Sequence, residues 1–182
     1  MVWTLGAAAL AYTPTAPEIL LKMAATLRRA EPVEVRVIRE SPDGEVSEEL
    51  LLTIPGKAGS GKNRQTALDL PYVLVTLPAE ELSEILPSVA SDDTEVTLGR
   101  FDGEVCYILE GKDEKIWVSK VGLIPLRIEV LSEKRLGTDY RYLDMVTLSD
   151  KVQYPSRTEV WRGGELILVE RLLPAAATSA RP

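Results

Sequence analysis

One segment of the chain has residue types and spacing that could bind phosphate. Residues 56–63 read GKAGSGKN and satisfy the G-x-x-x-x-G-K spacing of a phosphate-binding loop. In that motif a Ser or Thr follows the lysine and holds Mg²⁺, and a helix begins there. Here the position is Asn63, and Pro71 interrupts the segment that follows. We therefore interpret residues 56–62 as a flexible hairpin loop and not as a nucleotide site.

The other chemically active residue types are scarce. The chain has no histidine and one cysteine, Cys106. The absence of histidine removes His-based acid–base catalysis, Ser-His-Asp and Cys-His systems and His-containing metal sites. Cys106 lies in the apolar run VCYI, which predicts a packed, inert thiol. Adjacent acids such as Asp92 and Asp93 stand near expected turns, where carboxylates are ordinarily solvated. We predict a protein that is not an enzyme and has no metal or cofactor.

Length and charge limit the remaining classes. The 182 residues carry 21 Lys and Arg against 28 Asp and Glu, a net charge of -7. A nucleic-acid surface needs concentrated positive charge, so we predict no nucleic-acid partner. The length suits one domain, which we place at residues 12–173. Residues 174–182 contain no bulky apolar residue and predict a disordered tail.

The first eleven residues have two interpretations. They are mostly apolar and end in Ala9-Leu10-Ala11, a pattern typical of a signal-peptide cleavage site before Tyr12. No Lys or Arg precedes the apolar run, so the alternative is an ordinary frayed terminus. The run is too short to span a bilayer, which needs ~20 residues. We expect an exported, periplasmic protein.

Two helices are expected. Thr15 and Glu18 form a capping-box pair at the start of the first helix, which ends at about residue 30. Leu20, Met23 and Leu27 recur along it at helical spacing. A second helix is expected over residues 78–90, although Pro87 weakens its last turn. Three of its residues share one side and would cover the core with the first helix: Leu82, Ile85 and Leu86.

The rest of the chain alternates with the period of two that β-strands require. Turn residues separate short apolar–polar runs, and no crossover helix divides them after residue 90. We therefore predict an α+β, mainly β fold with an antiparallel sheet of about eleven strands. A sheet this long tends to curl. The strands are expected at residues 33–40, 45–54, 63–68, 72–77, 94–100, 104–110, 114–121, 125–132, 138–146, 156–162 and 165–173.

One face of this sheet collects more apolar side chains than two short helices easily cover. Either the helices pack flush and complete an ordinary core, or a cavity remains between them and the sheet. The residues expected to line that cavity are Val35, Val37, Leu50, Leu52, Val105, Tyr107, Leu109, Leu126, Ile128, Val130, Val160, Leu166 and Leu168.

The second half of the chain resembles a known group. Residues 115–130 contain KIWVSK followed by LIPLRIEV, and residues 140–144 read YRYLD. Residues 152–166 read VQYPSRTEVWRGGEL. Together these motifs resemble the outer-membrane lipoprotein-sorting (LolA/LolB-like) superfamily. One departure is Ile54-Pro55, where the lipoprotein carrier has Arg-Pro.

The resemblance implies a strongly bent antiparallel half-barrel whose concave face is covered by helices. It also implies a monomeric periplasmic carrier that shelters the acyl chain of a lipid or lipoprotein between an inner-membrane donor and an outer-membrane acceptor. An acyl chain needs a dry aliphatic groove and no catalytic group, at ~0.8 kcal/mol for each buried CH₂. The alternative is an envelope sensor or interaction module that binds a protein partner through a sheet edge or loop.

Overall fold

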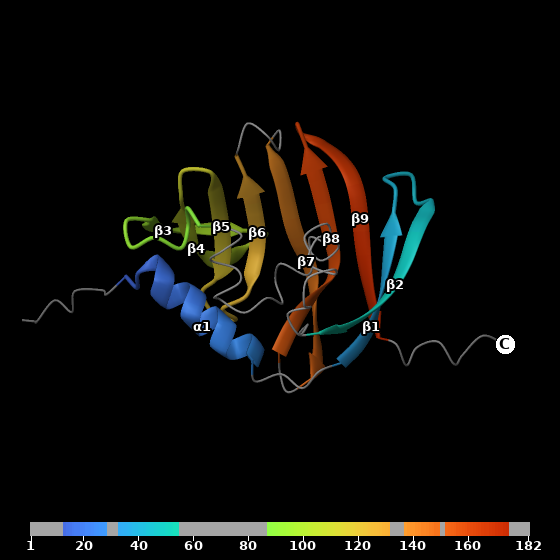
Figure 1. Cartoon of the computed structure of the whole chain (residues 1–182), viewed down its shortest axis with the longest axis horizontal. Coiled ribbons are helices and arrows are strands. Elements are labelled where there is room, and N and C mark those ends of the chain that lie inside the picture. Colours follow the sequence, from blue (N-terminus) through green and yellow to red (C-terminus); the bar gives the residue numbers. More distant parts are fainter. Residues whose placement is uncertain (1–12, 29–32, 55–86, 132–136, 150–151, 175–182) are drawn as a thin grey trace, which may run out of the picture.

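The computed structural model describes residues 13–28, 33–54, 87–131, 137–149 and 152–174. This part of the chain contains one helix and nine strands (Figure 1). Their bounds are α1 (Ala16–Arg28), β1 (Val33–Glu40), β2 (Val46–Ile54), β3 (Glu95–Phe101), β4 (Glu104–Glu110), β5 (Glu114–Ser119), β6 (Pro125–Val130), β7 (Thr138–Ser149), β8 (Val152–Arg162) and β9 (Glu165–Pro174). Within these residues no helix is long and apolar enough to cross a membrane.

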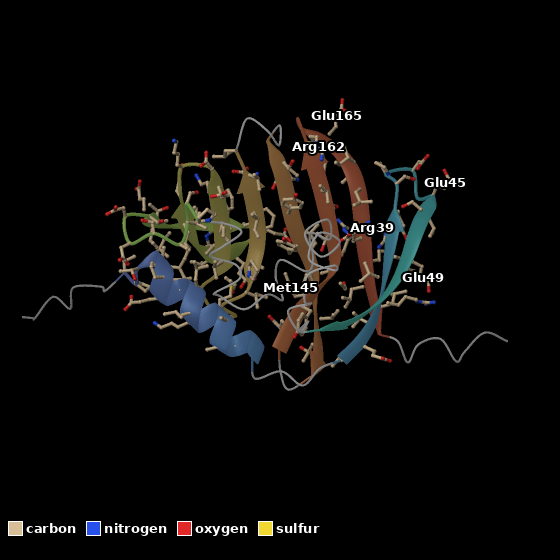
Figure 2. The ribbon with its side chains drawn as sticks, in the orientation of Figure 1. Arg39, Glu45, Glu49, Met145, Arg162 and Glu165 are labelled. Carbon is tan, nitrogen blue, oxygen red and sulfur yellow. The ribbon has the colours of Figure 1, made fainter. Side chains whose placement is uncertain are left out.

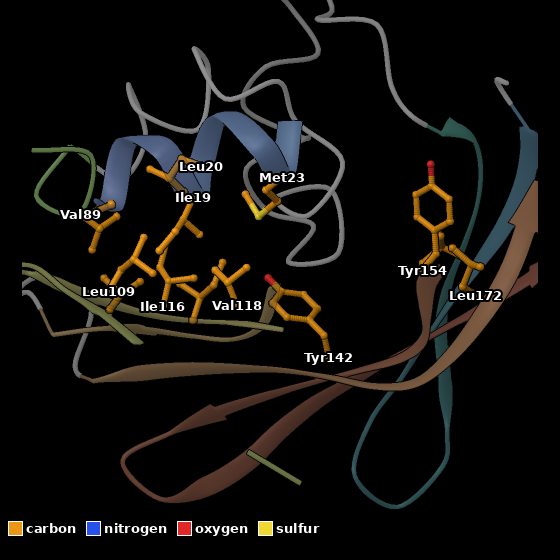
Figure 3. Close-up of a cluster of buried hydrophobic side chains, with 14 of the residues drawn as sticks. Ile19, Leu20, Met23, Val89, Leu109, Ile116, Val118, Tyr142, Tyr154 and Leu172 are labelled. Atoms are coloured by element: carbon orange, nitrogen blue, oxygen red, sulfur yellow. The ribbon is translucent and has the colours of Figure 1, made fainter. Parts of the chain in front are cut away.

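All nine strands form one open antiparallel sheet. The strand order is β2-β1-β9-β8-β7-β6-β5-β4-β3, so among the described strands β2 and β3 stand at the two edges. Strands β3 to β9 pair consecutively, and the β1–β2 hairpin joins the sheet beside β9. The sheet is curved, and α1 lies on its concave side (Figure 3). The predicted mainly β architecture with a curved antiparallel sheet is confirmed.

Each described strand lies close to a predicted one. The largest differences are at β8, which begins at Val152 and not at residue 156, and β7, which extends to Ser149. The predicted strands at 63–68 and 72–77 lie outside the described residues, so the count of eleven is not tested. The same holds for residues 78–86 of the predicted second helix.

The prediction that this second helix continues to residue 90 is wrong. Residues 87–89 form a turn and residue 90 a bend. Pro87 has no N–H for a helical hydrogen bond, so it cannot continue a helix. Ser88 is instead held at the β4–β5 hairpin, where its hydroxyl bonds the Glu114 carboxylate and accepts a hydrogen bond from the Asp113 N–H at 3.2 Å.

The start of α1 follows the capping rule that its sequence predicts. The Thr15 N–H donates to Glu18 Oε2 at 2.9 Å, and the Glu18 N–H donates to Thr15 Oγ1 at 3.4 Å. These bonds satisfy backbone donors that the first turn leaves unpaired. The buried side of the helix is formed by Ala16, Ile19, Leu20, Met23 and Ala24.

Alternation along the strands gives the sheet two different faces. On β4 and β5, Leu109 pairs with Ile116 and both belong to the cluster that contacts α1. Ile108 pairs with Trp117, and both belong to a second cluster that contains no residue of α1. Because paired residues of antiparallel strands point to the same side, these two pairs mark the concave and the convex face.

Candidate functional site

The first part of the candidate site lies under α1. Ile19, Leu20 and Met23 of the helix are at most 3% exposed and pack toward Leu109, Ile116 and Val118 (Figure 3). Ile128 and Val130 extend the same buried cluster along β6. All of these side chains are apolar, so they pack against one another without hydrogen bonds between them.

The second part lies on the other side of Tyr142 (Figure 3). Tyr154 and Leu172 are buried there, at 1% and 5% exposure. Val37 pairs with Leu172, and Val35 lies two residues before it on β1. Both valines belong to the same cluster and are at most 1% exposed. The apolar concave surface therefore continues across β8, β9 and β1, beyond the residues that α1 contacts.

A row of polar side chains crosses this concave surface. Tyr142 pairs with Thr158, Thr158 with Glu170, and Glu170 with Arg39, on four neighbouring strands. Arg39 Nε donates to Glu170 Oε1 at 3.0 Å, and the Glu170 side chain is only 1% exposed (Arg39 in Figure 2). Burial raises the pKa of Tyr142 well above its usual value, and Tyr140 and the negative charge of Glu170 raise it further. Tyr142 is therefore a neutral phenol at any physiological pH.

The hydroxyl of Tyr154 is a further polar group on this surface. The ring stands away from the sheet on the side of α1, with its oxygen at the far end (Figure 3). In the described part of the chain this buried oxygen has no hydrogen-bond partner. Burial raises the pKa of Tyr154 to about 12, so the hydroxyl is a neutral donor.

The convex face carries charged and aromatic side chains that satisfy one another. Arg127 donates to both oxygens of Asp139, at 2.8 and 3.0 Å, and lies 4.5 Å from the centre of the Trp117 ring. Burial lowers the pKa of Arg127, but the hydrogen bond and charge of Asp139, with Glu129, outweigh this and raise it. Arg141 repeats the pattern over Trp161 at 4.4 Å. Each of these groups already has partners, so we assign this face to stability.

The described residues include few side chains that could act as a nucleophile or a metal ligand. Cys106 is fully buried on the convex face, where desolvation and the charge of Glu104 raise the pKa of its thiol. A protonated, inaccessible thiol is a poor nucleophile. Among the described residues no three His, Cys, Asp or Glu side chains come together as a metal site would require.

Most predicted lining residues that the structure describes lie on the concave face. Buried members of this set are Val35, Val37, Leu109, Ile128, Val130 and Val160, and partly buried members are Val105, Tyr107 and Leu168. Leu50 and Leu52 stand opposite Val37 and Val35 on β2, but their side chains, like that of Leu27, lie outside what is described. Leu20 and Met23 of the predicted cover contact the cluster. Leu82, Ile85 and Leu86 fall outside the described residues.

Two lining predictions place the side chain on the wrong face. Leu126 is the extra residue of a β-bulge, because Trp117 pairs with Arg127 while Val118 pairs with Pro125. It packs with Trp117 and Cys106 in the convex cluster. A similar register shift on β9 sets Leu166 opposite Trp161, whose ring lies on the convex face. A bulge inserts one residue and so reverses the alternation on which the predictions depend.

Several residues of the concave cluster were not predicted. The same periodicity argument could have identified three of them. Ile19 lies one helical turn before Met23, and Ile116 and Val118 are two residues apart on one strand. The two buried tyrosines give a weaker signal, because a tyrosine in a strand is as compatible with the rim of a sheet as with its core. The Arg39–Glu170 pair joins positions 131 residues apart, so only the strand order brings it together.

These observations define a class: an open, curved antiparallel sheet with an apolar concave face crossed by a few polar groups and partly covered by one helix. Comparison with known proteins adds little sequence evidence. No family model matches the chain, and no curated protein matches it.

Solved structures with a similar arrangement exist. A DUF1329 family protein from Desulfovibrio piger is 14% identical, with a TM-score of 0.49 over 90% of this chain and 93% of that one. A domain assigned to outer-membrane lipoprotein sorting in Vibrio parahaemolyticus is 9% identical, with a TM-score of 0.49 over 91% and 93%. A LolA superfamily protein from Nitrosomonas europaea is 14% identical, with a TM-score of 0.45 over 88% and 91%. The second and third carry the name of the superfamily that the sequence resembles.

Proposed function

We propose that this protein binds the acyl chain of a lipid or lipoprotein on its concave face and carries it without chemical change. The observation that supports this most directly is the apolar set of Val35, Val37 and Leu172 on β1 and β9, which extends the cluster under α1 along the concave face. An aliphatic chain laid along such a surface gains ~0.8 kcal/mol for each CH₂ removed from water.

The contact between α1 and the sheet suits a movable cover. It is made by aliphatic side chains and Met23, whose unbranched side chain adapts to different neighbours. The periplasmic location, an inner-membrane donor, an outer-membrane acceptor and a monomeric state belong to the same proposal. They rest on the sequence resemblance.

Photochemical labelling of the unmodified protein tests the proposal. We expect a palmitoyl chain that carries a diazirine to label concave residues such as Met23, Val37 and Leu172. Peptides that carry convex residues such as Trp161 should stay unlabelled because that side chain packs against Arg141 on the opposite face of the sheet. Labelling spread equally over both faces, or none at all, would contradict the proposal. The readout is peptide mapping by mass spectrometry after irradiation.

Substitutions provide a second test. Ile128→Glu or Leu109→Glu places a charge among buried concave side chains and should abolish uptake of a fluorescent fatty acid in variants that still fold. The matched control is Leu21→Glu on the outer side of α1, where the wild-type side chain is 60% exposed. Normal uptake by folded Ile128→Glu would show that the chain binds elsewhere.

A second candidate function, binding of a protein partner, is favoured by one feature. Edge strand β3 contains neither proline nor lysine, and Leu98 at its centre is 56% exposed. Edge strands without such protection are open to pairing with another chain. Leu98→Lys should weaken capture of a protein partner if β3 pairs with one, whereas it should leave acyl uptake unchanged.

A further inference from the structure

The Tyr154 hydroxyl is a buried donor in apolar surroundings. The residue is 1% exposed, and in the described chain its oxygen has no hydrogen-bond partner. Its strand neighbour is Val146, which packs against the same cluster as Val35 and Leu172. A buried polar group without a partner destabilises the folded state, so natural proteins rarely retain one unless something else satisfies it.

The neighbourhood selects the chemistry of that partner. A carboxylate or phosphate brought to Tyr154 would lose its hydration among aliphatic side chains, which costs far more than one neutral hydrogen bond returns. A neutral acceptor loses much less. The carbonyl that joins an acyl chain to glycerol or to an amine is such an acceptor, and it lies at the end of the aliphatic chain that this surface suits.

The charged groups nearby are already engaged. Arg39 and Glu170 lie on the same concave face and bind each other. On β8, Thr158 of the polar row lies four residues from Tyr154, ~13 Å along the strand. A ligand carbonyl at Tyr154 would therefore lie in an apolar region, separated from the Arg39–Glu170 ion pair.

We propose that the Tyr154 hydroxyl donates a hydrogen bond to the carbonyl of an ester- or amide-linked acyl chain, so that the protein selects linked chains over free fatty acids. This inference rests on the proposed function. It goes further because it names the ligand class and the residue that determines it.

Four ligands of equal chain length test this selection. They are 1-palmitoylglycerol, the amide N-palmitoylethanolamine, 1-O-hexadecylglycerol, which has an ether in place of the carbonyl, and free palmitate. We expect the wild-type protein to bind the ester or the amide about five- to tenfold more tightly than the ether, the range that one hydrogen bond supplies. Palmitate should bind least. The comparison of ester with amide identifies which linkage fits.

The Tyr154→Phe variant tests whether the hydroxyl causes this preference. It should bind the ester no more tightly than the ether, while its affinity for the ether stays at the wild-type value. Without ligand it should be at least as stable as the wild type, because the substitution removes a buried donor that has no partner in the described chain. A preference that persists in Tyr154→Phe, or a loss of ether affinity as well, would overturn the assignment.

A spectroscopic measurement on the wild-type protein keeps the inference testable even if the variant does not fold. In the complex, the infrared band of a ¹³C-labelled ester carbonyl should lie at lower frequency than that of the same ester in hexane if Tyr154 donates to it. An unshifted band would contradict the inference while leaving acyl binding intact. Failure of all four ligands to bind would refute the proposed function itself, and this inference with it.

Discussion

At the scale of single residues, the ion pair of Arg39 and Glu170 on the concave face should contribute strongly to the stability of the fold. Their side chains are 17% and 1% exposed, so neither charge is well solvated. Removing one partner of a buried pair leaves the other charge uncompensated, which typically destabilises a protein by about 3–5 kcal/mol. Replacing both partners by apolar residues of similar size is often neutral or stabilising.

We therefore expect Glu170→Leu to lower the free energy of unfolding by about 3 kcal/mol, and the double variant Arg39→Met, Glu170→Leu to recover most of that loss. Urea unfolding of the three proteins measures both effects. A single variant as stable as the wild type would show that Arg39 turns outward to solvent when its partner is removed.

Tyr154 gives a second prediction at this scale. Its pKa is about 12 in the folded chain and 10.0 without the effect of burial, so between these values the folded state holds a proton that the unfolded state releases. The free energy of unfolding must then fall as pH rises from 10 to 12, by up to about 3 kcal/mol from this residue. At pH 7 the group contributes nothing to this dependence.

Tyr154→Phe should flatten that alkaline decline. Unfolding midpoints in denaturant at pH 9, 10 and 11 provide the measurement, with the wild type as reference. If the two proteins lose stability in parallel, Tyr154 ionises as readily in the folded chain as in the unfolded one.

At the scale of elements, the turn after Pro87 is fixed by close packing against the β4–β5 hairpin. A Cβ added at Gly111 would overlap the backbone carbonyl of Ser88. Backbone cannot move aside as a side-chain end can, so Gly111→Ala should destabilise the protein by about 1–3 kcal/mol. Gly122→Ala is the matched control, because its Cβ would meet its nearest neighbours at an ordinary 3.4 Å. Thermal unfolding compares the two, and equal melting temperatures would contradict the prediction.

The elements themselves were largely predictable. Period-two alternation identified all nine described strands, and Thr15 with Glu18 identified the start of α1. The bulges were not predicted: Pro125 beside Leu126 is compatible with a bulge but equally with the start of a strand, and the residues around Leu166 do not indicate where an extra residue is inserted. Prediction of the site failed at these two positions for that reason. The sequence analysis also missed the row of polar side chains from Tyr142 to Arg39, because the pairing of β1 with β9 depends on strand order across the whole sheet.

At the scale of the whole molecule, the two faces of the sheet have separate roles. The convex face joins β6, β7 and β8 through Arg127, Asp139 and Arg141, with each arginine stacked on a tryptophan. The concave face has long apolar stretches that carry no such ties. In the proposed carrier, a ligand would exchange on the concave face while the convex face keeps the strands in register.

The net charge of -7 bears on how the proposed carrier would meet a membrane. Anionic lipid surfaces repel a protein of this charge over about one Debye length, ~30 Å at 0.01 M salt and ~8 Å at 0.15 M. Release of a fluorescent acyl ester to vesicles that contain phosphatidylglycerol should thus become several-fold faster over that range of salt. Release to purely zwitterionic phosphatidylcholine vesicles should not change. Transfer that is equally fast to both vesicle types at 0.01 M salt would mean that the chain leaves the protein before any encounter with the bilayer, since only release into water is independent of the acceptor's charge.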